Sequence, residues 1–394
     1  MPRILFICTA APFGEAGGSG IRTRHIARLL AKVGPVTLVA ATANAWTPEQ
    51  VERTREAYGL ARFIKFQSVP NRSLPDQVRK ALDPRFLNTH GLGVSPDDAR
   101  FVAEQVEAHD VTWIHGIKTA NALGRFRWPR TVLDIDDFPS AFYRASGGLS
   151  RSLLVRLKSR HVAAVWRRRE RTCIERFPVL VVCKDEDRAL FGPPERVLAV
   201  PNGFEAPAPV PRSDMNGPCL GMIGDFNYLP NEDGLRWFVE QVWPAVRAQV
   251  PTATLRLVGR SSPERAARFA QSGVVGLGYV PDPAAEIASW SAMIVPTRLG
   301  GGTHLKVAEG LARRVSIVST AHGVRGYRVM HDRHVFVADS PLDFSARCVQ
   351  LLRDPAIGHR LATAGWELFQ QSYAWDSLAP TVAAAVETVS RVDF

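Results

Sequence analysis

Short apolar segments alternate with helix-type spacing along nearly the whole chain, and this alternation limits the fold more than any other feature. The apolar runs of the first half, which have the length of buried strands, are residues 4–8, 36–41, 111–115, 131–135 and 179–183. Between them, segments such as 26–33 and 97–108 repeat apolar residues every three or four positions, as helices do. Strands that alternate with helices form parallel sheets covered on both faces, so the sequence predicts an α/β fold.

A proline-rich segment, residues 201–211, divides this pattern and is typical of a linker between domains. After it the alternation resumes, with expected strands at 219–223, 254–258, 274–280, 292–295, 315–318 and 335–337. The expected helices of this part are residues 234–246, 341–352, 357–369 and 377–392. A chain of 394 residues also suits two domains of similar size.

We therefore expect two doubly wound, Rossmann-like domains that face each other across an interdomain cleft. The predicted boundaries are 1–203 for the first domain and 204–375 for the second, with residues 376–394 as a C-terminal helix that packs back on the first domain. Ligands bind at the carboxyl ends of strands in open parallel sheets, so these ends and the cleft are the default site.

The net charge of +11 restricts the partners of this chain. Such a charge permits nucleic acid, an anionic membrane surface or an acidic substrate. Basic residues are not interleaved with aromatic ones, so we expect no nucleic-acid partner. They gather instead between Arg151 and Arg176, where apolar residues recur at helical spacing. This stretch predicts either a helix lying on an anionic leaflet or a solvated helix whose apolar stripe faces its own core.

Three further features bear on where the protein works. No apolar run reaches the roughly 18 residues that a membrane-spanning helix needs. The apolar N-terminal residues 3–8 precede a glycine-rich loop and are typical of a first strand rather than a signal peptide. The five cysteines show no metal-ligand spacing, which favours a reducing compartment. We expect a cytoplasmic protein that binds the inner face of the plasma membrane peripherally.

Three consecutive glycines, residues 300–302, directly follow the expected strand 292–295 and precede a helical pattern. The free N–H groups of a first helical turn and the positive end of its dipole attract anions, and Lys306 adds a charge there. Glu309 lies one turn further on, where a carboxylate can accept hydrogen bonds from sugar hydroxyls. A tight turn before an ordinary amphipathic helix is the alternative interpretation.

Polar side chains also end two expected strands of the first half. His115 is the last residue of one strand, and Asp134, Asp136 and Asp137 end the next. Such carboxylates can bind a metal, cap an element or contact an acceptor; without a third ligand nearby we favour the last two and expect no metal. The loop at 9–20 is rich in glycine but lacks the spacing and the acidic residue of a dinucleotide-binding fingerprint, which argues against a nicotinamide dehydrogenase.

The order of these motifs resembles that of the family-4 glycosyltransferases of the GT-B architecture, in particular bacterial surface-polysaccharide members. The segments that carry the resemblance are residues 3–32, 181–190, 200–203, 223–231, 257–260, 278–282 and 300–309. The resemblance implies transfer of a sugar from a nucleotide diphosphate sugar to a hydroxyl of a glycan or lipid-linked acceptor. It further implies that the nucleotide sugar is a substrate, that no cofactor or metal is needed, and that the anomeric configuration is retained.

In this family the second domain holds the donor. By resemblance, Glu309 binds the ribose hydroxyls as the second glutamate of a Glu-x7-Glu motif, and the backbone of Gly278 and Tyr279 contacts the base. The resemblance assigns the diphosphate and sugar hydroxyls to Gly301, Gly302 and Thr303. Together with Lys306, these residues form the expected donor site.

In the first domain, Gly17 and Gly18 match the loop that approaches the diphosphate, and His115 matches the histidine that meets the transferred sugar. Asp136 and Asp137 are expected at the acceptor or behind the residues that touch substrate.

Two departures from the family pattern concern the donor site. Gly301 stands where the first glutamate of the motif belongs. Asp225 and Asn227 occupy the region that often carries arginine and lysine, so the diphosphate needs Lys306, with Arg260 and Arg298 behind it.

Two other functions remain open from the sequence. One is a nucleotide-sugar epimerase, which also uses two Rossmann-like domains and would need acid–base residues. The other is a basic module that binds an anionic polymer, an interpretation that rests on the net charge alone.

Overall fold

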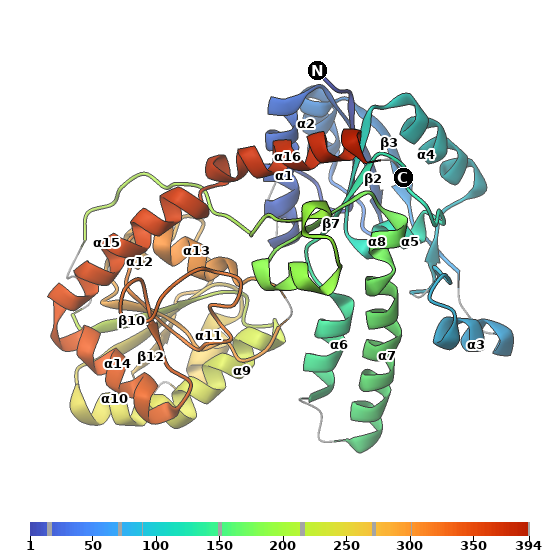
Figure 1. The fold of residues 1–394 in the computed structure, drawn as a ribbon. Coiled ribbons are helices and arrows are strands. Elements are labelled where there is room, and N and C mark those ends of the chain that lie inside the picture. Colours follow the sequence, from blue (N-terminus) through green and yellow to red (C-terminus); the bar gives the residue numbers. More distant parts are fainter. Residues whose placement is uncertain are drawn as a thin grey trace. The chain divides into compact units, whose positions relative to one another are not determined.

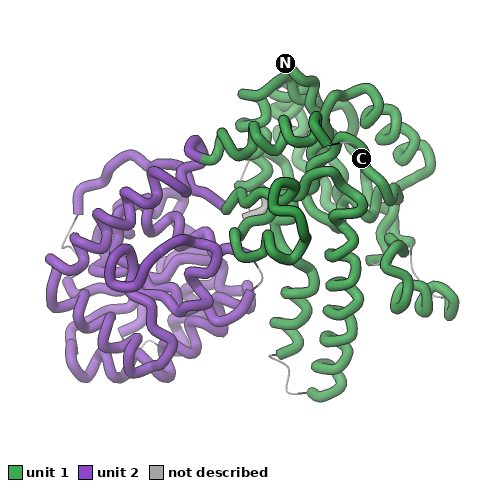
Figure 2. Tube along the Cα trace, in the orientation of Figure 1, with its two compact units in different colours: residues 1–201, 378–394 green, residues 202–377 purple. Residues whose placement is uncertain are grey.

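The computed structural model describes residues 1–13, 18–69, 73–88, 90–148, 152–212, 217–269, 273–300 and 302–392. The chain forms two compact units, coloured separately in Figure 2. One unit consists of Met1–Pro201 and Leu378–Phe394, and the other of Asn202–Ser377. Each contains a parallel sheet with helices on its faces, so the predicted α/β class with two Rossmann-like domains is confirmed.

The sheet of the first unit has the strand order β3-β2-β1-β6-β7-β8-β9, and neighbouring strands are parallel. Its strands are β1 (Ile4–Cys8), β2 (Val36–Thr42), β3 (Leu60–Lys65), β6 (Val111–His115), β7 (Thr131–Ile135), β8 (Val179–Val182) and β9 (Val197–Ala199). Strands β1, β6, β7 and β8 are buried throughout, as their uninterrupted apolar runs require. The short strands β4 (Gln67–Ser68) and β5 (Leu92–Gly93) pair separately and antiparallel.

The helices of the first unit are α1 (Gly18–Val33), α2 (Pro48–Tyr58), α3 (Leu74–Leu82), α4 (Pro96–Ala108), α5 (Ile117–Ala122), α6 (Pro139–Gly148), α7 (Leu153–Arg171), α8 (Cys173–Arg176) and α16 (Ala379–Arg391). Four of them, α2, α3, α4 and α7, begin at a serine or threonine whose side chain caps the first turn. Thr47 and Gln50 form a capping box at the start of α2, and Gly59 ends it in the left-handed region. Helices α6 and α7 extend side by side away from the sheet (Figure 1).

The C-terminal helix α16 belongs to the first unit, although it follows the second in the chain. It packs on α1 and on strands β6 to β9. Val382, Val386 and Val389 are buried there.

The sheet of the second unit has the order β12-β11-β10-β13-β14-β15, and its neighbours are also parallel. Its strands are β10 (Cys219–Ile223), β11 (Thr254–Val258), β12 (Val274–Gly276), β13 (Ala292–Val295), β14 (Ile317–Ser319) and β15 (Phe336–Val337). Its helices are α9 (Leu229–Trp237), α10 (Trp243–Gln249), α11 (Ser262–Ala267), α12 (Ala284–Ala288), α13 (Leu305–Ala312), α14 (Pro341–Arg353) and α15 (Pro355–Ser372).

The helix expected at 234–246 differs from the observed one. It begins earlier, at Leu229, and a π-helical turn, Phe238–Val242, separates α9 from α10. Pro244 lies in the first turn of α10 and has no N–H to donate, so the helical hydrogen-bond pattern has to change before it.

The segment expected to be a linker is partly bound to the second unit. Phe204 exchanges backbone hydrogen bonds with residues 373 and 375, and the Tyr327 hydroxyl donates to the Asn202 carbonyl at 3.3 Å. Residues from Asn202 onward therefore count as part of that unit.

Candidate functional site

The carboxyl ends of β10, β11 and β12 in the second unit lead into glycine turns. Gly224 follows β10, Gly259 follows β11 and Gly278 lies two residues after β12; their φ angles are 155°, 130° and 73°. A Cβ atom on Gly259 would lie 1.9 Å from the Gly224 carbonyl oxygen, so no other residue fits there. Because Gly224 and Gly259 approach each other so closely, this edge of the sheet presents backbone rather than side chains. An anionic or hydroxyl-rich ligand can reach that backbone.

Lys306, in the first turn of α13, points its ammonium group at this edge. Its Nζ donates to Asn231 Oδ1 at 2.6 Å, and a Cβ on Gly224 would lie 3.4 Å from the same Nζ. Burial lowers the pKa of Lys306 to about 8, while Glu309 opposes the shift. A cation held this way, in partial burial, is positioned to bind a diphosphate.

Glu309 lies one turn further along α13 and pairs with Arg313. Arg313 Nε donates to Glu309 Oε1 at 2.9 Å, and both side chains are largely shielded from solvent. Burial raises the pKa of Glu309, and Arg313 counteracts this. The paired carboxylate keeps further lone pairs for hydroxyl donors.

Thr303 lies in the turn before α13 and is held by the segment that enters the unit. Asn202 Nδ2 donates to Thr303 Oγ1 at 3.0 Å. Gly302 adjoins it, whereas Gly301 lies outside the described residues. Sequence analysis did not select Asn202, whose partner is about a hundred residues away in the chain.

Asp225 and Asn227 organise the turn after β10. The Asn227 N–H donates to Asp225 Oδ1 at 2.9 Å, and Asn227 Nδ2 donates to Ser261 Oγ at 2.8 Å. Asn231, which binds Lys306, also donates to the Asp225 carbonyl at 2.8 Å. These residues shape the loop around the lysine and supply no cation of their own.

The remaining residues expected at the donor lie on neighbouring turns. The Gly278 N–H donates to Ser262 Oγ at 2.9 Å, and the Tyr279 side chain is exposed beside it. Arg260 follows β11 and is exposed. Arg298 is not available to a diphosphate, because Asp233 binds its guanidinium through several contacts of 2.9–3.1 Å.

A second cluster of polar side chains lies at the carboxyl ends of β6, β7 and β8 in the first unit. His115 ends β6, Asp136 follows β7, and Cys183 follows β8. His115 Nε2 lies 3.7 Å from Asp136 Oδ2, and Cys183 Sγ lies 3.3 Å from Asp136 Oδ1. The His115 side chain is 5% exposed, and neither of its ring nitrogens has a hydrogen-bond partner among the described residues. A buried imidazole of this kind needs a substrate atom or water to complete its hydrogen bonds.

Asp137 brings a second carboxyl group to this cluster. Partial burial and the neighbouring Asp136 raise the pKa of Asp137 to about 6. Lys118 and Lys184 act on it in the opposite sense, and burial lowers the pKa of Lys118. Sequence analysis did not select these two lysines as site residues: Lys118 lies in α5, and Lys184 lies in the segment 181–190, to which the resemblance assigned no role.

Asp134 does not join the cluster. It forms a buried ion pair with Arg22, whose Nη2 lies 2.7 Å from Asp134 Oδ1, and both side chains are fully buried. Arg22 Nη1 also donates to the Val200 carbonyl at 3.0 Å. This pair ties α1 to the sheet and has a structural role. Of the two glycines expected to approach the diphosphate, Gly18 begins α1 and Gly17 lies outside the described residues.

Within the described part of the chain, no group of three His, Cys, Asp or Glu side chains is arranged to hold a metal ion. All five cysteines are free and buried. No helix among the described residues is both long and apolar enough to span a membrane.

Comparison with protein families places one match in the second unit. Residues 217–354, which run from β10 through α14, match the family model described as glycosyl transferases group 1. The match includes the glycine turns and all of α13. No curated protein matches the sequence.

Solved structures resemble the whole chain. Sucrose-phosphate synthase from Thermosynechococcus elongatus is 17% identical, with 97% of each chain covered and a TM-score of 0.64. Anabaena Alr3699/HepE in complex with UDP is 14% identical, with 99% of this chain and all of that chain covered and a TM-score of 0.64. WaaG, a glycosyltransferase involved in lipopolysaccharide biosynthesis, is 16% identical over 96% of this chain and 98% of its own, with a TM-score of 0.58. The fold is therefore that of the GT-B glycosyltransferases, as the sequence predicts.

Proposed function

We propose that this glycosyltransferase, whose residues 217–354 belong to the group 1 glycosyl transferases, moves a sugar from a nucleotide diphosphate sugar to an acceptor hydroxyl. One observation carries the proposal. Lys306 and Glu309 lie on one face of α13, beside the glycine turns, and each is held by a partner on another turn or on the same helix. An ammonium group and a carboxylate at that spacing match the diphosphate and the ribose of such a donor.

Glycosyl transfer builds negative charge on the leaving diphosphate and positive charge at the anomeric carbon. Lys306 and the N–H groups at the start of α13 would stabilise the first of these charges. Glu309 would accept hydrogen bonds from the ribose hydroxyls, and Arg313 favours its ionised form against the effect of burial. Gly278 and Tyr279 would contact the base, and Gly302 and Thr303 the sugar. Solved neighbours carry UDP and UDP-glucose, so UDP-sugars are the first donors to test.

His115 would meet the transferred sugar, because its buried ring nitrogens have no partner in the described chain. Asp136 holds that ring from one side at 3.7 Å and would act as a positioning residue. Asp137, with its pKa raised to about 6, would contact the acceptor. We propose that the reaction retains anomeric configuration, needs no metal or cofactor, and adds to a bacterial surface or secreted polysaccharide.

The basic helix α7 supports a peripheral membrane location. Its second half is packed, and Arg169 donates to four carbonyl oxygens, those of Lys80, Asp83, Phe86 and Val165, at 2.8–3.0 Å. Its first half packs on α6 along one side, where Ser159 lies against Gly147. On this half the side chains of Leu153, Leu154 and Leu157 are nevertheless 69%, 79% and 59% exposed, beside Lys158 and Arg160.

The apolar stripe in the first half of α7 therefore does not face the core of its own unit. Exposed leucines next to lysine and arginine suit an anionic leaflet. We propose that this end of α7 binds the inner face of the plasma membrane and brings the enzyme to a lipid-linked acceptor.

Titration calorimetry with UDP and GDP tests the donor site. We expect one of them to bind, and Glu309→Gln to weaken it by about a hundredfold, on the scale of lost charge-assisted hydrogen bonds. Glu264→Gln is the matched control, because Glu264 is an exposed carboxylate on α11 of the same unit. Equal affinities for the two variants would refute the assignment of Glu309.

A second measurement separates transfer from epimerisation. The protein is incubated with a labelled donor that binds, with and without an acceptor glycan, and the sugar is analysed. Transfer predicts a new glycosidic bond only with acceptor. Conversion of the donor sugar to an epimer without acceptor would favour the epimerase. Tight binding of an anionic polymer without nucleotide binding would favour the basic polymer-binding module.

A further inference from the structure

A cavity of about 630 Å³ lies at the opposite edge of the second sheet from the candidate donor residues. Gly217, Ser291 and Ser316, which line it, precede β10, β13 and β14 respectively. The donor residues follow the carboxyl ends of β10 to β13. A five-residue strand is about 16 Å long, so the cavity lies apart from the glycine turns, although Arg313, which binds Glu309, also lines it.

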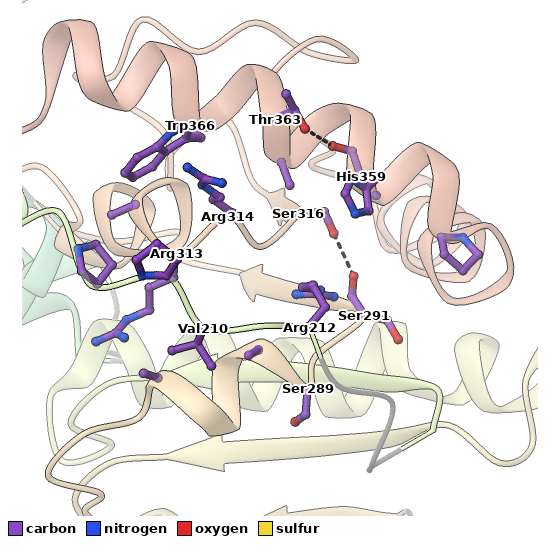
Figure 3. A pocket seen from close by; sticks show the side chains of 18 of the residues that line it. Val210, Arg212, Ser289, Ser291, Arg313, Arg314, Ser316, His359, Thr363 and Trp366 are labelled. Atoms are coloured by element: carbon purple, nitrogen blue, oxygen red, sulfur yellow. Dashed lines mark hydrogen bonds between the residues drawn. The ribbon is translucent and has the colours of Figure 1, made fainter.

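Most of the lining is apolar, and it comes from several elements. The segment 206–210 covers one side, the end of α13 forms another, and α15 contributes Gly358, Ala362 and Trp366. Figure 3 shows Val210 and Trp366 among the side chains around the cavity. A volume of this size with an apolar lining and few polar groups is typical of a site for a small organic molecule.

The charged groups that line the cavity are arginines. Arg212, Arg313 and Arg314 line it, and no aspartate or glutamate is among the lining residues that the structure describes. The Arg314 guanidinium lies 4.4 Å from the centre of the Trp366 ring, and the two side chains lie next to each other in Figure 3. No carboxylate of the described chain lies within ion-pair distance of Arg314.

The backbone supports this placement of Arg314. Its φ angle is 53°, a conformation that costs about 1 kcal/mol or more for a residue other than glycine. Residue 314 directly follows Arg313, and both arginines line the cavity. Of the two, Arg313 is the one that is already paired with a carboxylate, that of Glu309.

We propose that this cavity binds a small organic anion with a flat apolar body, such as an aromatic phosphate or carboxylate. The apolar lining, which includes Trp366 between Arg314 and Phe369, would hold the ring, and Arg314, with Arg212, would neutralise the acidic group. The serines at the base of the cavity already bond within the protein: Ser316 Oγ donates to the Ser291 carbonyl at 2.8 Å.

Calorimetry with 1-naphthyl phosphate and neutral 1-naphthol tests the proposal on the whole protein saturated with UDP. We expect 1-naphthyl phosphate to bind at one site and at least tenfold more tightly than 1-naphthol. Arg314→Ala should remove this preference while leaving 1-naphthol affinity within twofold. Arg347→Ala is the matched control, because its guanidinium also lies over a ring, that of Phe336, but outside the cavity.

Filling the cavity provides an independent variant. Ala362→Trp should abolish binding of both compounds while the melting temperature and UDP affinity stay near those of the parent protein. The proposal is overturned if 1-naphthyl phosphate does not bind, if UDP displaces it, or if Arg347→Ala weakens it as much as Arg314→Ala does. If Ala362→Trp fails to fold, the Arg314 and Arg347 pair still decides the question.

Discussion

The polar clusters at the strand ends of the two units differ in whether their charged and polar groups already have partners within the protein. In the second unit the charged groups are paired: Lys306 with Asn231 and Glu309 with Arg313. In the first unit His115 has no hydrogen-bond partner in the described chain, and Asp136 and Asp137 are adjacent like charges. Paired groups are held in fixed positions and suit the binding of one donor. An unsatisfied imidazole is completed by substrate, so His115 suits the chemical step or the acceptor.

The backbone of the second unit is also more tightly constrained at a glycine turn, and the first prediction tests this difference between the units. Gly259→Ala places a Cβ atom 1.9 Å from a carbonyl oxygen, at a φ of 130°, and should cost about 3 kcal/mol or more through strain and overpacking. Gly124→Ala is the control in the first unit: its φ is 76°, but a Cβ there would have open space, so about 1 kcal/mol is expected. Denaturant unfolding measures both, and equal losses would contradict the close approach of the two turns.

The second prediction separates donor binding from turnover. His115→Ala should lower kcat by about a hundredfold, because the group expected at the transferred sugar is removed, while the dissociation constant of UDP changes less than twofold. His109→Ala, on a histidine at the end of α4 in the same unit, serves as the control. Steady-state kinetics and calorimetry provide the two readouts. A loss of UDP affinity in His115→Ala would contradict the assignment of donor binding to the cluster of the second unit and of turnover to that of the first.

Much of the fold follows from the sequence because the central strands are buried on both faces. β1, β6, β7 and β8 need continuous apolar runs, and their positions were predicted within a residue or two. β3 was missed because it is half-exposed and follows α2 after a single glycine. Helix α3 was missed because none of its side chains is buried, so its apolar spacing of Leu74, Val78 and Leu82 reflects no core.

The motifs of the candidate site could be predicted from the sequence, but the hydrogen bonds between its residues could not. Glycine turns and strand ends can be recognised in sequence, since they depend on local geometry. The contacts of Lys306 with Asn231 and of Thr303 with Asn202 join residues 75 and 101 positions apart, and only the folded sheet brings them together. One sequence signal was available for Lys306: it is the only lysine after Lys184, in a chain that otherwise uses arginine there.

The third prediction uses the pKa of Lys306, lowered to about 8 by burial. The charged form binds the diphosphate, so kcat/KM for the donor should fall about tenfold per pH unit above pH 8. Arginine stays charged over this pH range, so the Lys306→Arg variant should show a lower kcat/KM that no longer falls above pH 8. Folding disfavours the ammonium form, so this group should make the free energy of unfolding rise with pH from about 8 to the ordinary lysine value of 10.5.

Amine labelling followed by mass spectrometry checks the Lys306 value directly. The rate for the peptide that carries Lys306 should reach half its maximum near pH 8, and UDP should protect it. Lys158, exposed on α7, is the internal control, and UDP should not change its labelling. Equal protection of the two lysines by UDP, or no protection of Lys306, would contradict the placement of Lys306 at the donor.

The smallest expected effect concerns the surface of the first unit. Leu154→Ser and Leu157→Ser together remove apolar area that is already exposed, so stability should change by less than about 0.5 kcal/mol. Binding to vesicles rich in phosphatidylglycerol should nevertheless fall about tenfold, because these leucines would enter the leaflet. Leu190→Ser, an exposed leucine outside α7, is the control. Because UDP binding depends on the other unit, it should be the same in all variants; co-sedimentation that does not change in the double variant would leave α7 as a solvated helix.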